Sequence, residues 1–446
     1  MKVDTEELLK KASKWNKIAS PYHRFYGGKV EVIPKCAMRS LQDFSIWYTP
    51  GVAEACRDIA KDPDQVYELT SKWNYVAVVS DGTRVLGLGD IGGHAGLPVM
   101  EGKALIFKYL GGVDAFPICL STKDPDEIVQ AVKWIEPTFG GINLEDFSKP
   151  KCFDILARLR KEMPIPVWHD DQQGTAAIIL AGVINALKVV GKKMDEAKFT
   201  IVGCGSANTR TFYVLEAAGV NTKNITVVDS AGILHPGRKE LEGTYKWDIT
   251  LKTNGEGKTG DMREAFKGSD IAIAASKPGP GTIKPDDIRL MADDPILFAC
   301  ANPVPEIWPW EAKEAGVKVM ATGRSDFPNQ VNNSLVFPAI FRGALDVRAK
   351  TITDEMCIAS ATELARYAED KGLSEDYIIP SMSEWEIYPR QAVETGMKAM
   401  EQGIARKKRS RQELYEHAES IIKRSQNIVT LLMREGLIEA PPPEPE

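Results

Sequence analysis

Short apolar runs that alternate with helical spacing are the main pattern along the chain. In the first half, residues 74–80 and 114–120 have the length of strands, and residues 100–110 have the apolar spacing of a helix. The segment 81–96, which follows the first of these strands, is rich in glycine. Strands that alternate with helices predict a parallel sheet with right-handed crossover connections.

The same alternation continues in the second half of the chain. Residues 175–190 are strongly apolar with helical spacing, and from about residue 354 onward the pattern is again helical. Short apolar strands are expected between these helical regions, at residues 199–202, 225–228, 270–274, 296–299 and 317–321. The chain therefore contains two successive stretches of α/β pattern.

Chain length supports a division into domains. A chain of 446 residues exceeds what one hydrophobic core usually organises. We predict an α/β protein with an N-terminal α/β substrate domain at residues 1–168. A Rossmann-type, doubly wound parallel-sheet domain follows at residues 169–380. A helical C-terminal segment is expected at residues 381–446.

The two termini carry weaker patterns. Residues 5–19 predict an amphipathic helix, and residues 22–43 are polar and irregular. Near the other end, the basic run at residues 406–409 is interpreted as one solvated face of a helix. Nucleic-acid binding is the alternative for this run, and the acidic balance of the chain counts against it. The proline-rich end, residues 440–446, is expected to be a disordered tail.

A glycine turn in the second half carries the signal for a dinucleotide. The strand at residues 199–202 is followed by a helix, and the next strand ends at Asp229. The turn between the first strand and its helix reads Gly203-Cys204-Gly205-Ser206-Ala207-Asn208. Gly203 permits the tight turn, and Gly205 lets backbone amides approach a pyrophosphate at the helix N-terminus. Asp229 is placed to accept a hydrogen bond from a ribose hydroxyl. Asn208 stands where this fingerprint usually has a third glycine.

Two later turns are expected to border the same ligand. One contains Ser276 and the other contains Asn302, and each follows a predicted strand. Ligands of open parallel sheets lie beyond the carboxyl ends of the strands. Ordinary turn chemistry, in which Pro and Gly need no ligand, is the alternative explanation.

Two carboxylate pairs indicate a metal site. Glu145-Asp146 and Asp170-Asp171 each lie beside an apolar segment. Carboxylates that gather in one place repel each other unless a cation neutralises them. Mg²⁺ or Mn²⁺ is the natural partner, because hard cations prefer oxygen ligands. Taken alone, either pair could instead be a surface feature or a helix cap.

Composition narrows the classes of function. The net charge of −6 offers no basic footprint for nucleic acid or anionic lipid. No apolar run is long enough to span a membrane, and the N-terminus has no apolar signal core, so a cytoplasmic protein is expected. The seven cysteines are scattered without a CxxC pair, and His is scarce. These features disfavour a disulfide framework and a zinc site.

A nicotinamide cofactor and a hard metal together indicate hydride transfer from a hydroxy acid. In such a site the metal holds the hydroxyl and a neighbouring carboxylate and then stabilises an enolate. A base for the hydroxyl proton and a cation for the carboxylate are also required. Tyr48, Arg84 and Lys103 are the candidates in the first domain.

These motifs together resemble the malic enzyme family, the oxidative decarboxylases of malate. The resemblance runs from about residue 47 to residue 338 and fits the short form, without the acyltransferase domain that some bacterial members carry. It rests on Tyr48-Thr49-Pro50-Gly51-Val52, Arg84 with the glycine run 87–92, Gly102-Lys103-Ala104, Leu144-Glu145-Asp146-Phe147, Asp170-Asp171 before Gly174-Thr175-Ala176, Asn302-Pro303, and Asn332-Asn333 before Phe337-Pro338.

The resemblance implies a role for each candidate near the metal. Glu145, Asp146 and Asp171 correspond to the ligands of Mg²⁺ or Mn²⁺. Lys103 corresponds to the general base that removes the hydroxyl proton of malate. Asp170 would lie beside this lysine and tune it.

It also implies roles for residues that hold the substrate and complete the reaction. Tyr48 corresponds to the acid that protonates C3 of enolpyruvate. Arg84 would pair with the C1 carboxylate of malate, where its planar fork suits a bidentate contact. Asn302 and Asn333 correspond to contacts with the substrate and the nicotinamide. The implied substrate and product are L-malate and pyruvate, and the implied assembly is a homodimer or homotetramer.

The choice between the two nicotinamide cofactors leans towards NAD. A carboxylate at Asp229 repels a 2′-phosphate, and Ser230-Ala231-Gly232 offers no cation that would bind one. Arg238 and Lys239 lie further along the chain and could do so, so NADP stays open.

Three other functions compete with this interpretation. A malolactic-type lyase would use the same site and give lactate. An amino-acid-dehydrogenase-like oxidoreductase also pairs a lysine-bearing domain with a Rossmann domain, but it needs no metal. A non-enzymatic module that senses a dinucleotide would have no use for Tyr48 and Lys103.

Overall fold

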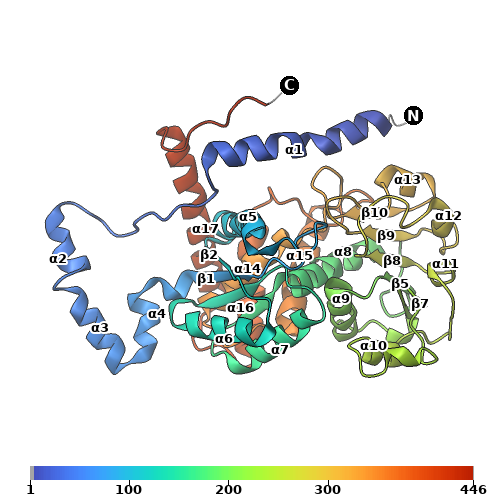
Figure 1. The fold of residues 1–446 in the computed structure, drawn as a ribbon, viewed down its shortest axis with the longest axis horizontal. Coiled ribbons are helices and arrows are strands. Elements are labelled where there is room, and N and C mark those ends of the chain that lie inside the picture. The colour runs from blue at the N-terminus through green and yellow to red at the C-terminus, as the bar shows by residue number, and fades with distance from the viewer. Residues whose placement is uncertain (1–4, 445–446) are drawn as a thin grey trace.

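Two parallel β-sheets organise the chain. The computed structural model describes residues 5–444, with the backbone alone for residues 5–13. The first sheet has the order β2-β1-β3-β4, with β1 (Tyr75–Ser80), β2 (Asp114–Cys119), β3 (Gly141–Leu144) and β4 (Val167–His169). The second has the order β10-β9-β8-β5-β6-β7, with β5 (Phe199–Val202), β6 (Ile225–Asp229), β7 (Gly232–Ile233), β8 (Ile271–Ala274), β9 (Ile296–Ala299) and β10 (Val319–Thr322). The two sheets lie in neighbouring parts of the molecule (Figure 1).

Helices connect and cover the strands of the first sheet. They are α5 (Gly92–Gly111), α6 (Pro125–Ile135) and α7 (Lys151–Glu162). All strand pairs in this sheet are parallel, and the inner strands β1 and β3 are almost completely buried. Strands covered on both faces read as continuous apolar runs, as β1 does. Helix α6 begins where the side chain of Asp124 accepts hydrogen bonds from the amides of Asp126 and Glu127.

The second sheet follows the doubly wound pattern. Strands β5, β6, β8, β9 and β10 are parallel, and only the two-residue β7 at the edge is antiparallel. Helix α8 (Thr175–Val189) leads into this sheet and is buried around most of its circumference. The remaining helices of the sheet are α9 (Ser206–Ala217), α10 (Trp247–Lys252), α11 (Met262–Phe266), α12 (Pro285–Ile288) and α13 (Pro309–Glu314).

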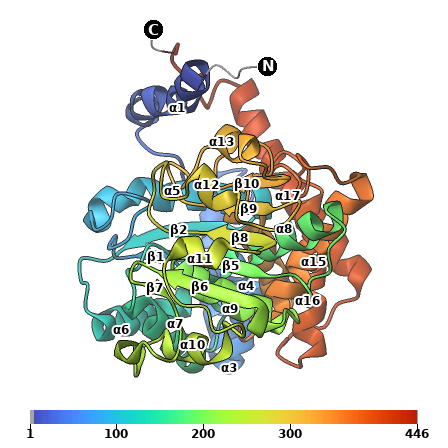
Figure 2. The same cartoon turned by 90° about the vertical axis from the view of Figure 1, so that its right-hand side faces the viewer.

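Four C-terminal helices pack against elements of both sheets. They are α14 (Phe337–Asp346), α15 (Asp354–Lys371), α16 (Ile387–Glu401) and α17 (Arg411–Arg434). Helices α15, α16 and α17 lie on the same side of the molecule in Figure 2. Helices α14 and α17 pack on α5 beside the first sheet, and α15 packs on α8 beside the second. The fully buried Arg342 donates hydrogen bonds to Asp346 and to Asn74, next to β1. One continuous apolar core therefore includes residues of both sheets and of these helices.

The N-terminal segment extends away from this body. Helix α1 (Thr5–Tyr26) lies near the C-terminus, where the hydroxyl of Tyr26 donates to the Glu439 carbonyl at 2.9 Å. Residues 27–70, here called the N-terminal arm, contain the short helices α2 (Phe44–Trp47), α3 (Val52–Lys61) and α4 (Val66–Leu69). In Figure 1 α2 and α3 lie at the margin of the molecule, away from both sheets.

The predicted fold class is confirmed, and the predicted strands at residues 199–202 and 296–299 coincide with β5 and β9. Two helix boundaries differ clearly from the prediction. Helix α1 runs on to Tyr26, into the segment expected to be irregular. Helix α5 begins eight residues before the expected start, within a glycine-rich stretch that has weak helix propensity. Of the expected tail, residues 440–444 have no helix or strand, and residues 445–446 lie outside the described part.

The prediction of a helix face at residues 406–409 is wrong. These residues connect α16 to α17, and Gly403 with φ +70° follows the end of α16. The backbone amides of Arg406 and Lys407 donate to the carbonyl of Val347 instead of continuing a helix. Throughout residues 5–444, no helix combines the length and apolar character needed to cross a bilayer.

Candidate active site

A cavity of about 910 Å³ lies between the two sheets, at the carboxyl ends of their strands. Loops after β1, β3 and β4 border it on one side, and loops after β5, β6, β8, β9 and β10 border it on the other. It gathers most of the predicted site residues: Arg84, Lys103, Glu145, Asp146, Asp171, Gly203, Gly205, Ser206, Ala207, Asp229, Ser276, Asn302 and Asn333. Tyr48, Asp170 and Asn208 do not line the cavity.

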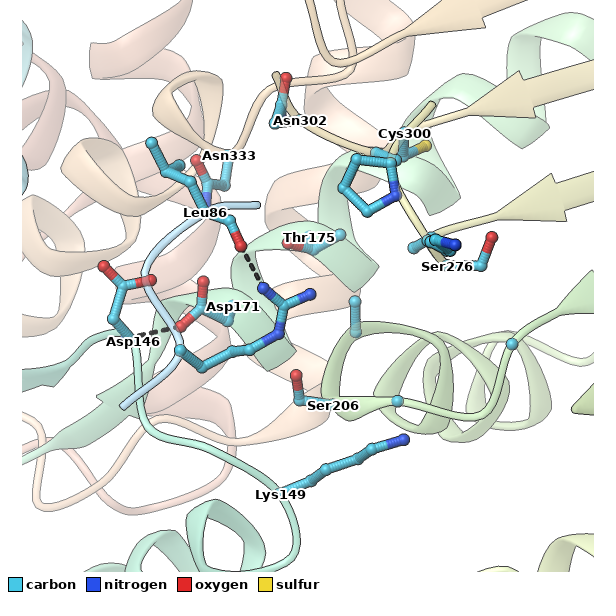
Figure 3. A pocket seen from close by; sticks show the side chains of 18 of the residues that line it. Leu86, Asp146, Lys149, Asp171, Thr175, Ser206, Ser276, Cys300, Asn302 and Asn333 are labelled. Carbon is cyan, nitrogen blue, oxygen red and sulfur yellow. Dashed lines mark hydrogen bonds between the residues drawn. The ribbon is translucent and has the colours of Figure 1, made fainter. Parts of the chain in front are cut away.

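Three carboxylates converge at one end of this cavity. Glu145 and Asp146 follow β3, and Asp171 lies in a π-helical turn, Asp170–Gly174, that follows β4. One oxygen from each of the three lies within 4.8 Å of the others. The amide of Asp146 donates to Asp171 Oδ2 at 2.8 Å, which locks the two loops together (Figure 3). A Cβ at Gly174 would lie 2.0 Å from Asp170 Oδ1, so the turn requires glycine there.

Electrostatics at this cluster indicate a cation site. Burial raises the pKa of Asp146 to about 8, and the charge of Asp171 adds to this rise. Burial likewise raises the pKa of Glu145 and Asp171, although the charge of Lys103 opposes the rise. Asp146 Oδ2 is buried without a hydrogen-bond partner among the described residues. Three oxygen donors, one of them unsatisfied, fit a hard divalent ion such as Mg²⁺ or Mn²⁺.

Lys103 lies against this cluster on helix α5. Its ammonium forms ion pairs with Glu145 at 3.1 Å and with Asp170. Asp170 is fully buried, and it also accepts a hydrogen bond from the indole of Trp168 at 3.1 Å. Burial alone would lower the pKa of Lys103, but the surrounding carboxylates, Asp170 first, outweigh it and raise the pKa. Asp170 therefore fixes the position of Lys103 from behind the cavity wall.

Arg84 and two asparagines border the space in front of the carboxylates. The backbone amide of Arg84 donates to the carbonyl of Asp146, and its guanidinium donates to the carbonyl of Leu86. Asn302 and Asn333, which follow β9 and β10, border the same space (Figure 3). The cavity thus places cationic and amide donors around the acidic cluster, an arrangement suited to a small carboxylate substrate.

The glycine turn has the geometry expected for a dinucleotide. Gly203 has φ +92°, and a Cβ there would lie 3.1 Å from the Cβ of Ser276. A Cβ at Gly205 would meet no atom within 4 Å, so the turn is open towards the cavity. Asn208 is buried and donates to the carbonyls of Val202 and Gly203 at 2.8 and 3.0 Å. At the third glycine position, Asn208 therefore stabilises the turn from behind.

Asp229 lies between two cations at the end of β6. Arg238 Nη1 donates to its Oδ1 at 2.8 Å, and Lys246 forms a second ion pair. Burial favours a higher pKa for Asp229, but the hydrogen bonds from Arg238 and Lys246 outweigh it and lower the pKa. Lys239, the other predicted phosphate ligand, instead pairs with Glu242 at 3.1 Å and does not line the cavity.

Sequence reasoning missed three residues of this site. Lys149 and Lys246 line the cavity, and the buried Glu306 accepts hydrogen bonds from the amide and hydroxyl of Ser276 at 2.8 and 3.1 Å. Lys246 lies 17 positions after Asp229, and Glu306 lies 30 positions after Ser276. Neither separation corresponds to a local motif. Lys149 follows Asp146 by only three positions, and this proximity was the available signal.

Tyr48 was expected beside Lys103, but the chain does not bring the two together. Tyr48 follows α2 in the N-terminal arm, and its side chain is 70% exposed. No tyrosine is among the described residues that line the cavity. Within a single chain, the proposed proton donor and the proposed base therefore lie apart.

A Rossmann sheet whose glycine turn faces a buried acidic cluster defines a dinucleotide-binding α/β protein with a metal-competent centre. Two family descriptions match the chain: "Malic enzyme, N-terminal domain" over residues 27–160 and "Malic enzyme, NAD binding domain" over residues 172–400. Together these cover most of its length, and the chain therefore belongs to the malic enzyme family.

Individual relatives agree with this assignment. The "NAD-dependent malic enzyme" of Geobacillus stearothermophilus is 51% identical over 382 residues, which is 85% of this chain and 78% of the relative. The "Bifunctional malic/malolactic enzyme" of Bacillus subtilis is 48% identical over 384 residues, which is 86% of this chain and 93% of the relative. The crystal structure of Entamoeba histolytica malic enzyme superposes with a TM-score of 0.97 at 44% identity, covering 99% of this chain and 93% of that one.

The acidic cluster makes a prediction about metal binding. In an Asp171→Asn variant, Mn²⁺ affinity should fall by about 100-fold or more, since loss of even an outer-shell partner costs 10–100-fold. Because burial raises the pKa of Asp146 to about 8, metal competes with protons, and affinity should increase from pH 6 to pH 8. Isothermal titration calorimetry measures both effects. Asp126→Asn, at an acid 83% exposed, is the control, and unchanged affinity in Asp171→Asn would refute the ligand set.

Proposed function

We propose that this chain catalyses the oxidative decarboxylation of L-malate to pyruvate and carbon dioxide, with reduction of NAD(P)⁺. The observation that carries the proposal is the convergence in one cavity of an acidic cluster, a buried lysine and a dinucleotide turn. An amino-acid dehydrogenase would have no use for the cluster formed by Glu145, Asp146 and Asp171. A sensing module would not need Lys103 held between two carboxylates.

The proposal assigns a role to each side chain in or beside the cavity. Arg84 binds the C1 carboxylate of malate, and Asn302 and Asn333, which line the same cavity, contact the substrate and the nicotinamide. In its neutral amine form, Lys103 removes the proton of the C2 hydroxyl, and Asp170 holds the amine in place for that transfer. A bound nicotinamide would supply the acceptor for the C2 hydride, and a bound divalent ion would supply Lewis-acid polarisation of the C2 oxygen. Glu145, Asp146 and Asp171 would hold that ion.

Protonation of C3 after decarboxylation requires an acid, and Tyr48 is assigned this role in trans. The N-terminal arm exposes many apolar side chains, which monomeric proteins rarely do over such an area. Those at least half exposed are Val32, Leu41, Phe44, Ile46, Trp47 and Tyr48. In a symmetric homodimer, each arm would cover its apolar side chains against the other subunit. We infer that the arm carries Tyr48 into the cavity of the partner chain.

The cofactor preference assigned here is NAD over NADP. Asp229 is ionised, and a carboxylate repels a 2′-phosphate while accepting a hydrogen bond from a 2′-hydroxyl. Arg238 and Lys246 weaken this preference, because they could bind a 2′-phosphate if their ion pairs with Asp229 were broken. NADP is therefore a weaker but competent cofactor.

A malolactic reaction is the second candidate. The Bacillus subtilis relative is named as a bifunctional malic/malolactic enzyme. Lactate formation needs no further protein group, because reduction of pyruvate reverses the same hydride transfer while the cofactor stays bound. The two outcomes differ in product and in net cofactor reduction.

The decisive assay combines L-malate, Mn²⁺ and either NAD or NADP. We expect the absorbance of the reduced nicotinamide to increase only when metal is present, and pyruvate to form in equal amount. The kcat/KM should be higher with NAD than with NADP. Lactate without net reduction would favour the malolactic reaction. Absence of turnover while the protein still binds the cofactor would refute the proposed function.

Mixing two inactive variants tests the shared site. Tyr48→Phe and Lys103→Ala should each be nearly inactive, but mixed dimers contain one intact site if Tyr48 acts in trans. After dissociation and reassembly, activity should return to roughly a quarter of the wild-type value, from statistical pairing in a two-fold dimer. Lys103→Ala mixed with Asp171→Asn is the control, since both defects lie in the same cavity and no mixed dimer is repaired. Failure of the first pair to recover would place Tyr48 in its own subunit's site or outside catalysis.

Cofactor choice depends on Asp229. In an Asp229→Asn variant, Arg238 and Lys246 lose their carboxylate partner and become available to a 2′-phosphate. The ratio of kcat/KM for NADP to that for NAD should increase by about 10–100-fold, because an ionic interaction with the 2′-phosphate forms while the hydrogen bond to the 2′-hydroxyl weakens. Asp248→Asn, a surface acid of the same domain, should leave the ratio unchanged. An unchanged ratio in Asp229→Asn would remove this residue from cofactor selection.

A further inference from the structure

The loop that supplies two of the acidic residues also carries an uncommitted cation. Lys149 lies three positions after Asp146, between β3 and α7, and lines the cavity. Its ammonium forms no ion pair or side-chain hydrogen bond with any described residue. Three other basic side chains around the cavity are engaged: Arg84 with Leu86, Lys103 with Asp170 and Glu145, and Lys246 with Asp229. Lys149 and Lys277 are therefore the two uncommitted cations among the described lining residues.

Packing across the cavity fixes the Lys149 loop next to the glycine turn. Phe153, at the start of α7, lies with its ring centroid 4.9 Å from that of Tyr245, which belongs to the second sheet's side of the cavity. The hydroxyl of Tyr245 donates to the carbonyl of Cys204, in the middle of the turn, at 2.7 Å. This chain of contacts spans the cleft and places the beginning of α7 beside the segment that leads into α9.

The Lys149 side chain extends on the side of the cavity where α9 begins. Figure 3 shows it running beneath Ser206, the first residue of α9. The charge of Lys149 acts on a residue of the turn. Burial raises the pKa of the Cys204 thiol, and Lys149 is among the cations that oppose this rise. The position therefore brings a positive charge to the place where the turn presents backbone amides.

The turn itself supplies amides but no charged side chain. Gly203, Gly205, Ser206 and Ala207 offer backbone groups and the N-terminal end of the α9 dipole. A dinucleotide pyrophosphate carries two negative charges, which are costly to hold in a partly enclosed cleft without a counter-charge. A flexible ammonium from the facing loop provides one.

We propose that Lys149 binds the pyrophosphate of the dinucleotide across the domain cleft. This inference rests on the proposed function only in taking NAD(P) as the ligand of the turn. The β3–α7 loop would then bind two ligands: Glu145 and Asp146 would bind the metal, and Lys149 would bind the cofactor. Cofactor binding would then pull this loop, and the two acidic residues on it, towards the second sheet.

Direct binding tests the assignment without relying on turnover. We expect Lys149→Ala and Lys149→Gln to increase the Kd for NAD, NADP and ADP-ribose alike by about 10-fold, the usual effect of losing one hydrogen bond to a charged group. Lys149→Arg should restore most of the affinity. Lys408→Ala, at an exposed lysine outside this cavity that has no ion-pair partner among the described residues, removes the same charge and should change none of the three constants. Mn²⁺ affinity should stay at the wild-type value in all variants.

Other outcomes would overturn the assignment. A loss confined to NADP would place Lys149 at the 2′-phosphate. An increase in the KM for malate with unchanged Kd for ADP-ribose would make it a substrate contact. Unchanged constants in both Lys149 variants would leave the residue without a role in binding. If the wild-type protein bound ADP-ribose normally but did not turn over malate, the proposed function alone would fail. If it bound no dinucleotide, both proposals would fail.

Discussion

The gathering of four carboxylates, three of them buried, around a single ammonium is the constraint on which this structure depends. Glu145, Asp146, Asp170 and Asp171 surround Lys103, and in the absence of a metal ion the charges do not balance. Because burial and the charge of Asp171 raise the pKa of Asp146 to about 8, ionising this carboxyl at neutral pH costs roughly 1 kcal/mol. A bound divalent ion would remove this penalty. The fold therefore holds excess negative charge that metal binding would neutralise.

The surrounding architecture can be understood as support for this cluster. Lys103 is held on α5, and Phe337, at the start of α14, lies with its ring centroid 4.7 Å from the ammonium. Helix α14 comes after the whole second sheet, yet it packs on α5 and buries Arg342 against Asn74. The return of the C-terminal helices to the first sheet therefore closes the apolar wall behind Lys103. A two-domain chain without this return would leave that side of the cluster open to water.

Sequence patterns predicted the elements and the local motifs, because both depend on neighbours along the chain. The strand β5 and the turn at Gly203 and Gly205 are defined by a contiguous apolar run and two glycines. The function of Asn208 could not be read in this way, because its bonds to Val202 and Gly203 depend on how α9 folds back. Similarly, the pairing of Lys246 with Asp229 requires a loop of 16 intervening residues to close.

Tyr48 shows a different limit of sequence reasoning. Its motif identifies the residue type that the chemistry needs, but a linear motif carries no information about which chain's cavity receives the side chain. Exposure supplies the missing information: Leu41 and Tyr48 are 82% and 70% exposed, so the described part of their own chain leaves most of their surface uncovered. Water contact over such side chains costs about 25 cal/mol for each Å² of apolar surface, so a row of them favours association. If Tyr48 acts in trans, the same contact that buries the arm also completes the catalytic site, and assembly and activity become a single equilibrium.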